Sequence, residues 1–250
     1  MVDMLDHTKK LAADHNSAIM FEIFDEHDGV LRQDTAGNII ITNENNLEGG
    51  RNSMSWDERY SEPGFAYGTA PNEFLRSVVN RIPQGNILSL AEGEGRNAVY
   101  LASLGYQVTG VDGSQVGLRK AMELAKERGV AITTIHADLN EFEIEPGKWD
   151  GIITCYCHVP SAIRIQLHHA AVRGLKPGGV FVLEGFSKEQ ISYGTGGPQS
   201  LDMLYSLEEL RGELAGLELV HAIKLERDVR EGRGHTGIAS VVQILGIKTT

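Results

Sequence analysis

The chain has few cysteines, few basic residues and no long apolar run. Its 250 residues contain only two cysteines, Cys155 and Cys157. They are separated by one residue in a predicted strand, so their side chains would point to opposite faces, which disfavours a mutual disulfide. A Cys-x-Cys pair without further ligands gives no basis for a metal site, and we predict none.

Two further absences bear on where the protein acts. No apolar stretch reaches membrane-spanning length, and the N-terminus lacks the basic and apolar regions of a secretory signal. We therefore expect a soluble, cytoplasmic protein without a membrane partner. The 23 basic residues face 34 acidic ones, giving a formal net charge of −11. Because phosphate backbones require clustered Lys and Arg, we expect no nucleic-acid partner and a small-molecule substrate instead.

The first 53 residues differ from the rest of the chain. They contain ten acidic and four basic side chains, so about half of the net charge lies there. The patterns favour a helix over Met4–Ala13 and strands over Ala18–Phe24 and Asn38–Thr42. We predict an N-terminal appendage over 1–53 and one main domain over 54–250. The appendage would pack on the main domain or on a second subunit, which keeps a homodimer open.

The main domain is organised around the stretch from Asn86 to Ser114. Its parts are a short apolar run (Ile87–Leu90), a glycine turn (Glu92–Gly95), a helical pattern (Arg96–Leu104) and a second apolar run (Tyr106–Val111) that ends on Asp112. This order is typical of a right-handed parallel βαβ unit. The glycines let backbone amides approach a ligand, and Asp112 can accept hydrogen bonds from ribose hydroxyls. The stretch predicts a pocket for a nucleoside cofactor. It does not choose between cofactors, because Gly93-x-Gly95-x-x-Ala98 also satisfies the dinucleotide-binding pattern.

Strands and helices continue to alternate after this unit. Further strands are predicted over Ala131–His136, Trp149–Tyr156, Val180–Glu184, Leu217–Leu225 and Ile238–Gly246. Since no helix separates the last two, joined by a predicted loop over Glu226–Gly237, the final strand should run antiparallel. We predict an α/β fold with a doubly wound, mostly parallel seven-stranded sheet and an antiparallel last strand, a Rossmann-like arrangement.

Several side chains are predicted to cap helices or cover the sheet's edge. Asn72, Ser114 and Ser161 are expected N-caps, and Ser206 with Glu209 forms an expected capping box. The glycine-rich segment Ser192–Ser200 is long enough to act as a lid.

The order of these features resembles the class I S-adenosylmethionine-dependent methyltransferases. The resemblance rests on the glycine turn, Asp112, Ala137-Asp138-Leu139 and Leu175-Lys176-Pro177-Gly178-Gly179. Within that class, Trp56-Asp57-Glu58-Arg59-Tyr60, Gly93-Glu94-Gly95-Arg96-Asn97 and Cys157-His158-Val159-Pro160 are similar to the TehB-like branch of tellurite-resistance and thiol methyltransferases. The resemblance covers about residues 54–247 and excludes the appendage.

The resemblance implies S-adenosylmethionine as the cofactor, with S-adenosylhomocysteine as product. Gly93 and Gly95 would contact its methionine part, Asp112 its ribose, and Asp138 with the Leu139 amide its adenine. Further implied contacts are Arg59, Tyr67, Glu92, Asn97, Gly113 and Cys155. The sequence departs from the family at Ser89, where an acid is usual, and at Ala91, where glycine is usual. Ala91 is small, so the turn remains feasible if its φ is negative, and Glu92 at the next position can take over part of the missing acid's role.

Methyl transfer from a sulfonium is an in-line displacement, in which alignment supplies much of the acceleration and a base is needed only for a protonated acceptor. The acceptor should lie over the carboxyl ends of the strands. Candidate catalytic residues there are His158, Tyr156 and His235. The acceptor would be a thiol, a chalcogen oxyanion or another metabolite.

Two alternatives remain open from the sequence. A nicotinamide-dependent oxidoreductase could use the same glycine turn, although no Tyr-x-x-x-Lys pair is present. The other is a non-catalytic cofactor-binding or oligomerisation protein, which stays open because the appendage has no assigned role.

Overall fold

The computed structural model describes residues 23–24, 29–33, 39–43 and 54–249. The chain divides into two compact units, Met1–Met54 and Ser55–Thr250. In the first unit, β1 (Ile23–Phe24), β2 (Gly29–Gln33) and β3 (Ile39–Asn43) form an antiparallel sheet in that order. The strand β3 coincides with a predicted strand, whereas β2 was not predicted. The predicted helix over Met4–Ala13 lies outside the described residues.

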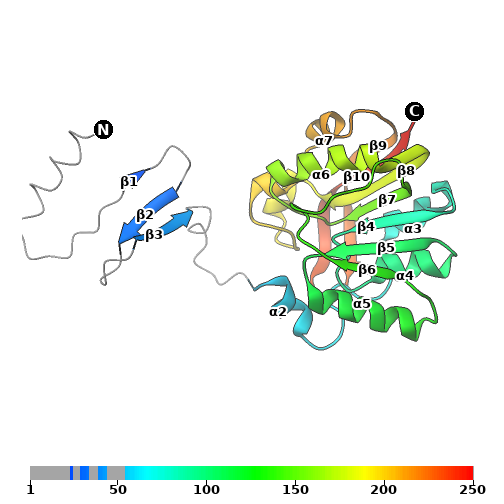
Figure 1. Ribbon diagram of the computed structural model, residues 1–250, viewed down its shortest axis with the longest axis horizontal. Coiled ribbons are helices and arrows are strands. Elements are labelled where there is room, and N and C mark those ends of the chain that lie inside the picture. The colour runs from blue at the N-terminus through cyan, green and yellow to red at the C-terminus, as the bar shows by residue number, and fades with distance from the viewer. Residues whose placement is uncertain (1–22, 25–28, 34–38, 44–53, 250) are drawn as a thin grey trace, which may run out of the picture. The chain divides into compact units, whose positions relative to one another are not determined.

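The second unit contains a seven-stranded sheet with the order β6-β5-β4-β7-β8-β10-β9 (Figure 1). Its strands are β4 (Asn86–Leu90), β5 (Gln107–Asp112), β6 (Thr133–His136), β7 (Trp149–Cys155), β8 (Leu175–Phe186), β9 (Leu217–Glu231) and β10 (His235–Lys248). Only β10 runs antiparallel to its neighbours, β8 and β9, and the other pairs are parallel. The predicted fold class is confirmed.

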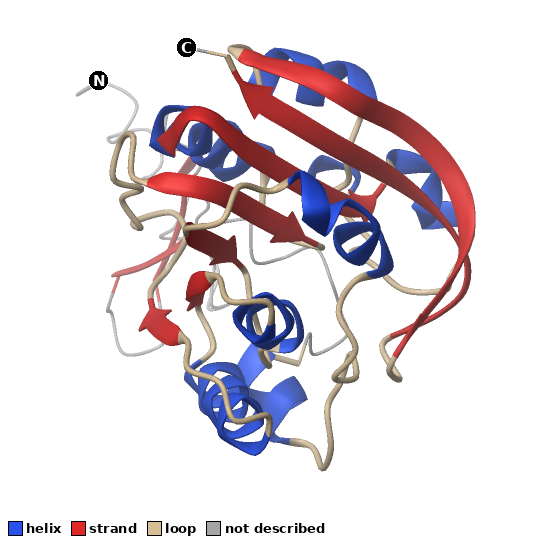
Figure 2. Cartoon of the chain, turned by 90° about the vertical axis from the view of Figure 1, so that its right-hand side faces the viewer, coloured by secondary structure: helices blue, strands red, loops and turns tan. Residues whose placement is uncertain are grey.

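Helices cover both faces of this sheet, as Figure 2 shows. They are α2 (Trp56–Ser61), α3 (Glu73–Val78), α4 (Arg96–Ser103), α5 (Gln115–Glu127), α6 (Ser161–Gly174) and α7 (Leu207–Glu213), with short 3₁₀ turns at Val79–Arg81, Lys188–Ser192 and Leu201–Met203. Within the part of the chain that the structure describes, none of the helices combines the length and apolar character needed to cross a bilayer.

The central strands β4, β7 and β8 bury both of their faces over most of their length, which explains their continuous apolar runs. Neighbouring residues alternate between two cores. Ile87 and Ile153 belong to the core beneath α3, α4 and α5. Leu88 and Ile152 belong to the core beneath α6 and α7. This alternation fixes the three-layer order and places the tips of β4, β5 and β7 at one edge of the sheet.

Helix caps follow the sequence only in part. Asn72 and Ser114 cap α3 and α5 as predicted, by accepting the amides of Leu75 and Gly117. The prediction for Ser161 is wrong, because α6 begins at Ser161 itself and Asp202 accepts the Ser161 amide at 2.9 Å.

The predicted capping box at the start of α7 is also wrong. Ser206 stands at the N-cap but makes no side-chain cap hydrogen bond. Glu209 instead pairs with Arg164 of α6 and with Lys188. Its carboxylate thus ties α7 to neighbouring segments and does not reach back to its own helix.

The largest departure from the predicted fold lies in the closing hairpin. The loop predicted over Glu226–Gly237 is wrong, because β9 continues to Glu231 and β10 already begins at His235. Glu231 and His235 face each other across this tight turn. The hairpin therefore carries two buried polar side chains toward the sheet's carboxyl edge.

Candidate active site

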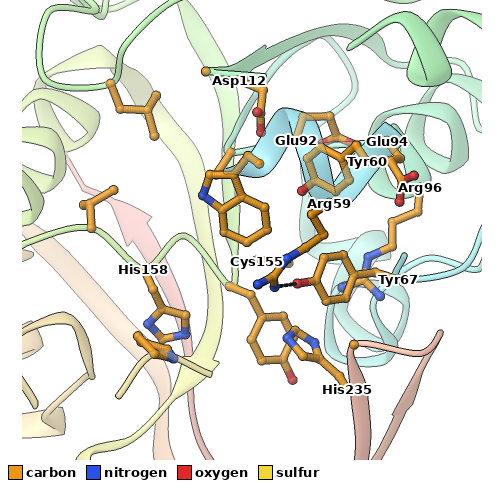
Figure 3. Close-up of a pocket in the computed structure, with 18 of the residues that line it drawn as sticks. Arg59, Tyr60, Tyr67, Glu92, Glu94, Arg96, Asp112, Cys155, His158 and His235 are labelled. Carbon is orange, nitrogen blue, oxygen red and sulfur yellow. Dashed lines mark hydrogen bonds between the residues drawn. The ribbon is translucent and has the colours of Figure 1, made fainter. Parts of the chain in front are cut away.

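A cavity of about 1100 Å³ opens at the carboxyl ends of β4, β5 and β7. Its wall is formed by the segment from Ser55 to Gly68, the turn after β4, the tips of β5, β6 and β7, the loop at Gly196–Pro198 and the β9–β10 hairpin. Asp112 and His235 lie toward opposite sides of it, with Arg59 between them (Figure 3). All but two of the predicted site residues border this cavity, the exceptions being Gly93 and Gly95.

Asp112 joins the tip of β5 to the turn that follows β4. Its buried carboxylate accepts the amide of Gly93 at 2.7 Å and the amide of Ser114 at 2.7 Å. Burial raises the pKa of Asp112, and the two amide hydrogen bonds oppose that shift. Asp138 borders the same cavity after β6, where one of its oxygens accepts the Asn140 amide at 2.8 Å. The two predicted acids therefore share one cavity.

Gly93 and Gly95 shape the turn and do not themselves border the cavity. Both have left-handed φ values, 60° and 92°. A Cβ on Gly93 would lie 2.6 Å from the Tyr60 hydroxyl, and one on Gly95 would lie 2.6 Å from Ala121 of α5. The structure gives these glycines a packing role, and their contacts with a cofactor stay a prediction.

Ala91 and Glu92 occupy the positions where the sequence departs from the family pattern. Ala91 has a φ of +52°, so the turn forms without the negative φ on which its feasibility was made conditional. Glu92 is buried, and one of its oxygens accepts the amides of Asn97 and Ala98 at the start of α4. The other accepts the hydroxyl of Ser89, and burial raises the pKa of Glu92 to about 7.

Three side chains of the segment before the sheet form one wall of the cavity. Arg59 donates from Nη1 to the Tyr67 hydroxyl at 2.8 Å and lies 4.8 Å from the centre of the Trp56 ring (Figure 3). Trp56 is 53% exposed although it is a large aromatic residue. Trp56, Arg59 and Tyr67 all border the cavity, so this wall offers aromatic rings and one guanidinium.

The loop that carries Tyr67 is fastened to the main domain by Glu94 and Lys120. Glu94 accepts the Ala66 amide at 2.6 Å and pairs with Lys120 at 2.8 Å. Lys120 also donates to the backbone carbonyls of Glu62 and Gly64. This buried clamp fixes the wall relative to α4 and α5.

His158 uses both ring nitrogens on the backbone. Nδ1 donates to the Met203 carbonyl at 2.8 Å, and Nε2 accepts the Phe186 amide at 3.1 Å. Burial lowers the pKa of His158 to about 4. The ring borders the cavity, but neither nitrogen is available to an acceptor, so the structure does not support His158 as a base.

Tyr156 follows β7 with a φ of +57°, an uncommon conformation for a bulky residue. Its hydroxyl donates to the buried carboxylate of Glu184 at 3.1 Å. Burial raises its pKa well above the ordinary value. Tyr156 therefore presents its ring to the cavity while its hydroxyl is engaged elsewhere. Cys155 also borders the cavity, and burial raises the pKa of its thiol well above the usual range.

His235 lies in a different setting. It is buried at the cavity wall, and its Nδ1 is 3.4 Å from a carboxylate oxygen of Glu231. Arg96, which also borders the cavity, donates to the same carboxylate at 2.8 Å. Burial lowers the pKa of His235, and Glu231 opposes this shift. Among the described residues, Nε2 of His235 has no hydrogen-bond partner.

The sequence reasoning missed Arg96, Glu231 and Phe186, all of which shape the site. Arg96 stands in a predicted helix start, and nothing in the sequence shows which acid it faces. Glu231 could have been found, because Gly232 and Gly234 between it and His235 are typical of a tight hairpin turn. Phe186 follows the end of the predicted strand by two residues, and only the tertiary packing places its ring against His235.

The fold and the position of this site define the domain as one with the class I S-adenosylmethionine-dependent methyltransferase fold. Residues 87–179 match the family described as "Methyltransferase domain". TehB from Haemophilus influenzae superposes with a TM-score of 0.59 at 18% identity, covering 71% of this chain and 62% of that one. A SAM-dependent methyltransferase from Methanosarcina mazei superposes with a TM-score of 0.56 at 19% identity, covering 69% and 97%. The predicted resemblance, with S-adenosylmethionine as the cofactor of the class, is confirmed.

Two relatives share sequence with the chain. A 2-heptyl-1-hydroxyquinolin-4(1H)-one methyltransferase of Mycobacteroides abscessus is 27% identical over 141 residues, covering 55% of this chain and 62% of the relative. A ubiquinone biosynthesis O-methyltransferase of Rickettsia canadensis is 28% identical over 124 residues, covering 48% and 51%. The chain thus spans less than two thirds of the length of these relatives.

Proposed function

We propose that this protein transfers a methyl group from S-adenosylmethionine to a small-molecule acceptor. The observation that carries the proposal is that one cavity of about 1100 Å³ joins Asp112 and Asp138, at the strand tips, to an aromatic chamber formed by Tyr67, Tyr156 and Phe186. Ligand sites for a single drug-sized molecule commonly measure about 300–1000 Å³. The cavity has room for a nucleoside cofactor together with an acceptor.

The residues around the cavity fit the functional groups of S-adenosylmethionine. Asp112 retains lone pairs that can accept the ribose hydroxyls, since a carboxylate offers about four acceptor sites and two are taken by amides. Arg59 offers a guanidinium for the carboxylate of the methionine part. The rings of Trp56, Tyr60 and Tyr67 offer π faces to its positive charges. When bound, this cofactor supplies a methyl group already activated by the positive sulfur.

The remaining predicted cofactor contacts are arranged for supporting roles. Leu139 and Gly113 border the cavity near Asp138, and we assign them to the adenine and ribose side. Asn97 borders it at the start of α4, where its side-chain oxygen accepts the Asn72 amide at 2.9 Å. Glu92 holds the start of α4 in place. We assign it the role of the acid that is usual in the family at the position of Ser89.

The identity of the acceptor is the finer part of the proposal. The Mycobacteroides relative is named for a hydroxyquinolone, and the Rickettsia relative is named as an O-methyltransferase. The thiols and chalcogen oxyanions that the sequence resemblance implies remain further candidates. Each of these candidates is a small molecule, and we infer that the methyl acceptor of this protein is a small metabolite.

Calorimetry and a transfer assay test the proposal together. We expect S-adenosylhomocysteine to bind the full chain with micromolar or tighter affinity, and NADH not to bind. Transfer of isotope-labelled methyl from S-adenosylmethionine is then measured on a panel of 2-heptyl-1-hydroxyquinolin-4(1H)-one, 4-nitrophenol, 4-nitrothiophenol and tellurite. Binding of NADH in place of S-adenosylhomocysteine would establish the oxidoreductase alternative. Binding without transfer to any panel member would favour the non-catalytic alternative.

A further inference from the structure

Glu231 and His235 form a carboxylate–imidazole pair at the edge of the cavity. The two residues face each other across the β9–β10 turn, and Nδ1 of His235 lies 3.4 Å from Oε2 of Glu231. Such a carboxylate selects the tautomer with the proton on Nδ1, which leaves the Nε2 lone pair free to accept a proton. Hydrogen bonds of this kind are often long in a free enzyme and shorten once the substrate is bound.

The carboxylate of Glu231 is held ionised by its surroundings. Arg96 donates to Oε2 at 2.8 Å, and Asn72 donates to Oε1 at 3.1 Å. Arg227 approaches Oε1 to 3.5 Å. The contacts with His235 and Arg96 outweigh burial and lower the pKa of Glu231 to about 2. A permanently charged, buried carboxylate is suited to stabilising an imidazolium when one forms.

The imidazole of His235 lies within an aromatic chamber. The ring centres of Tyr67 and Tyr156 are each 4.5 Å from its own, and Phe186 meets it edge-on at 4.9 Å. The loop at Gly196–Gly197 closes the chamber without side chains. Rings on several sides and a glycine wall favour a flat aromatic acceptor.

Three other titratable groups at the cavity are already engaged in hydrogen bonds. Both nitrogens of His158 bond the backbone, and the hydroxyl of Tyr156 bonds Glu184. The two carboxylate oxygens of Glu92 accept hydrogen bonds from the Ser89 hydroxyl and from the amides of Asn97 and Ala98. Asp112, His136 and Asp138 border the cavity at and after the ends of β5 and β6, on the side assigned to the cofactor. Among the described residues, His235 is the histidine of the aromatic chamber whose Nε2 has no hydrogen-bond partner.

We infer that His235, oriented by Glu231, is the general base for an acceptor that carries its nucleophile as a hydroxyl on an aromatic ring. This inference rests on the proposed methyl transfer. The acceptor oxygen forms the new O–C bond to the methyl carbon, the electron pair of the breaking S–C bond stays on sulfur, and the hydroxyl proton passes to Nε2 of His235 and then to water. An aryl thiol, which is largely ionised at neutral pH, does not need this base.

The charges around His235 set the direction of its pH response. Those charges and titratable groups are Glu231 on β9, Arg96 on α4, Arg59 on α2, Tyr67 in the preceding loop, and Tyr156 and His158 after β7. Burial and the two arginines favour the neutral imidazole, whereas Glu231 favours the protonated form. The pKa of His235 is therefore lowered from the ordinary histidine value. Methyl transfer to a hydroxyl should be lost only when the pH falls below this pKa, because the protonated imidazole cannot accept the hydroxyl proton.

The decisive experiment compares oxygen and sulfur acceptors of the same shape. At pH 8, in His235→Gln, we expect transfer to 4-methylphenol, which stays protonated in water at this pH, to fall about 10²–10⁴-fold, while transfer to 4-methylthiophenol, which is largely ionised, changes less than tenfold. Added imidazole should restore part of the activity of His235→Ala. His168→Gln is the matched control, because His168 also bonds a buried glutamate, Glu213 at 2.7 Å, but does not border the cavity. It should retain both activities.

A binding measurement gives a readout that is independent of turnover. At pH 8, in the presence of S-adenosylhomocysteine, calorimetry in two buffers of different ionisation enthalpy should detect proton uptake when 4-nitrophenolate binds. His235→Gln should bind without uptake. Glu231→Gln should move the acid limb of the pH profile to lower pH, since the carboxylate raises the pKa of His235.

Three kinds of outcome distinguish a failure of the inference from a failure of the proposed function. Equal loss of both activities in His235→Gln, or no proton uptake by the unaltered protein, would overturn the role of His235 while methyl transfer to the thiol still stood. Transfer to the thiol or to tellurite, with no binding of any aromatic hydroxyl compound, would overturn the acceptor class. Absence of S-adenosylhomocysteine binding would overturn the proposed function itself.

Discussion

The Ser89 hydroxyl, inside β4, donates a hydrogen bond to the carboxylate of Glu92, three residues further along the chain. Glu92 thus places a carboxylate beside the position in β4 where the family usually has an acid. Both side chains are buried, and the second oxygen of Glu92 accepts the amides of Asn97 and Ala98. Amides at a helix start carry partial positive charge, which suits a carboxylate. The turn can bind the start of α4 although the strand itself carries no acid.

Replacing Glu92 by Gln should change how stability depends on pH. The native pKa of about 7 lies above the ordinary value of 4.5, so the native state binds this proton more tightly than the unfolded chain. The associated stabilisation is present below pH 4.5 and is lost as the pH rises through 7, an effect on the order of 3 kcal/mol. The glutamine oxygen can still accept the amides of Asn97 and Ala98, and its N–H₂ group can donate to the Ser89 hydroxyl oxygen, but the side chain does not titrate.

Urea unfolding of the cofactor-free protein between pH 5 and pH 8 measures this effect. The stability of Glu92→Gln relative to the original protein should rise steadily with pH. Glu123→Gln, on the exposed face of α5, should show a constant difference. A pH-independent difference for Glu92→Gln would show that the carboxylate is already ionised at pH 5.

Asp112→Asn should weaken cofactor binding. The amide keeps only one acceptor oxygen, so one of the bonds from Gly93 and Ser114 is lost and an N–H₂ group faces the ribose site. Loss of a hydrogen bond to a charged group corresponds to about a 10–100-fold weaker Kd. Calorimetry with S-adenosylhomocysteine measures this change directly.

Asp150→Asn is the matched control for that substitution. Asp150 likewise accepts a backbone amide, from Asn86 at 2.8 Å, and also pairs with Lys176, but it lies at the start of β7, away from the cavity. It should lower the Tm without changing the Kd. An unchanged affinity in Asp112→Asn would remove the ribose assignment.

Lys120→Met should loosen the wall that carries Tyr67. Lys120 bridges the carbonyls of Glu62 and Gly64 to the buried Glu94, so its loss leaves Glu94 without its cation. Amide hydrogen exchange over residues 62–68 should accelerate, and the affinity for S-adenosylhomocysteine should fall severalfold. Lys126→Met, on the exposed side of the same helix, should alter neither. Unchanged exchange in Lys120→Met would mean that the aromatic packing alone holds the loop.

The tips of the central strands could be predicted from the sequence because they depend on local signals. Apolar runs of strand length, a glycine turn and the cap at Ser114 specify β4, α4 and β5 without knowledge of the rest. Asp112 then falls at the carboxyl edge by topology alone. The aromatic half of the cavity depends on packing between segments far apart in the sequence, and it was not predictable in the same way.

The long hairpin shows why that half was missed. The residues of β9 near its end are charged, so the sequence pattern there is typical of a loop. Arg227 and Glu231 are nevertheless accommodated because Glu184 and Arg96, distant in sequence, neutralise them. The sequence likewise could not predict which of His158 and His235 has a free ring nitrogen. The hydrogen bonds that engage His158 involve backbone atoms of Met203 and Phe186, which lie far from it in the sequence.

Gly197→Ala should obstruct the acceptor chamber while sparing the cofactor side. Its new Cβ would lie 2.7 Å from the Phe186 ring, at a φ of +90°. The ring or the loop must shift, so we expect 4-nitrophenol to bind the S-adenosylhomocysteine complex about tenfold more weakly, with the Kd of S-adenosylhomocysteine unchanged. Gly194→Ala carries comparable backbone strain, at a φ of +66°, but its Cβ meets nothing within 4 Å. It should leave both affinities intact, because only contact with Phe186, and not loop strain, reaches the chamber. Equal weakening by both substitutions would instead assign the effect to loop conformation.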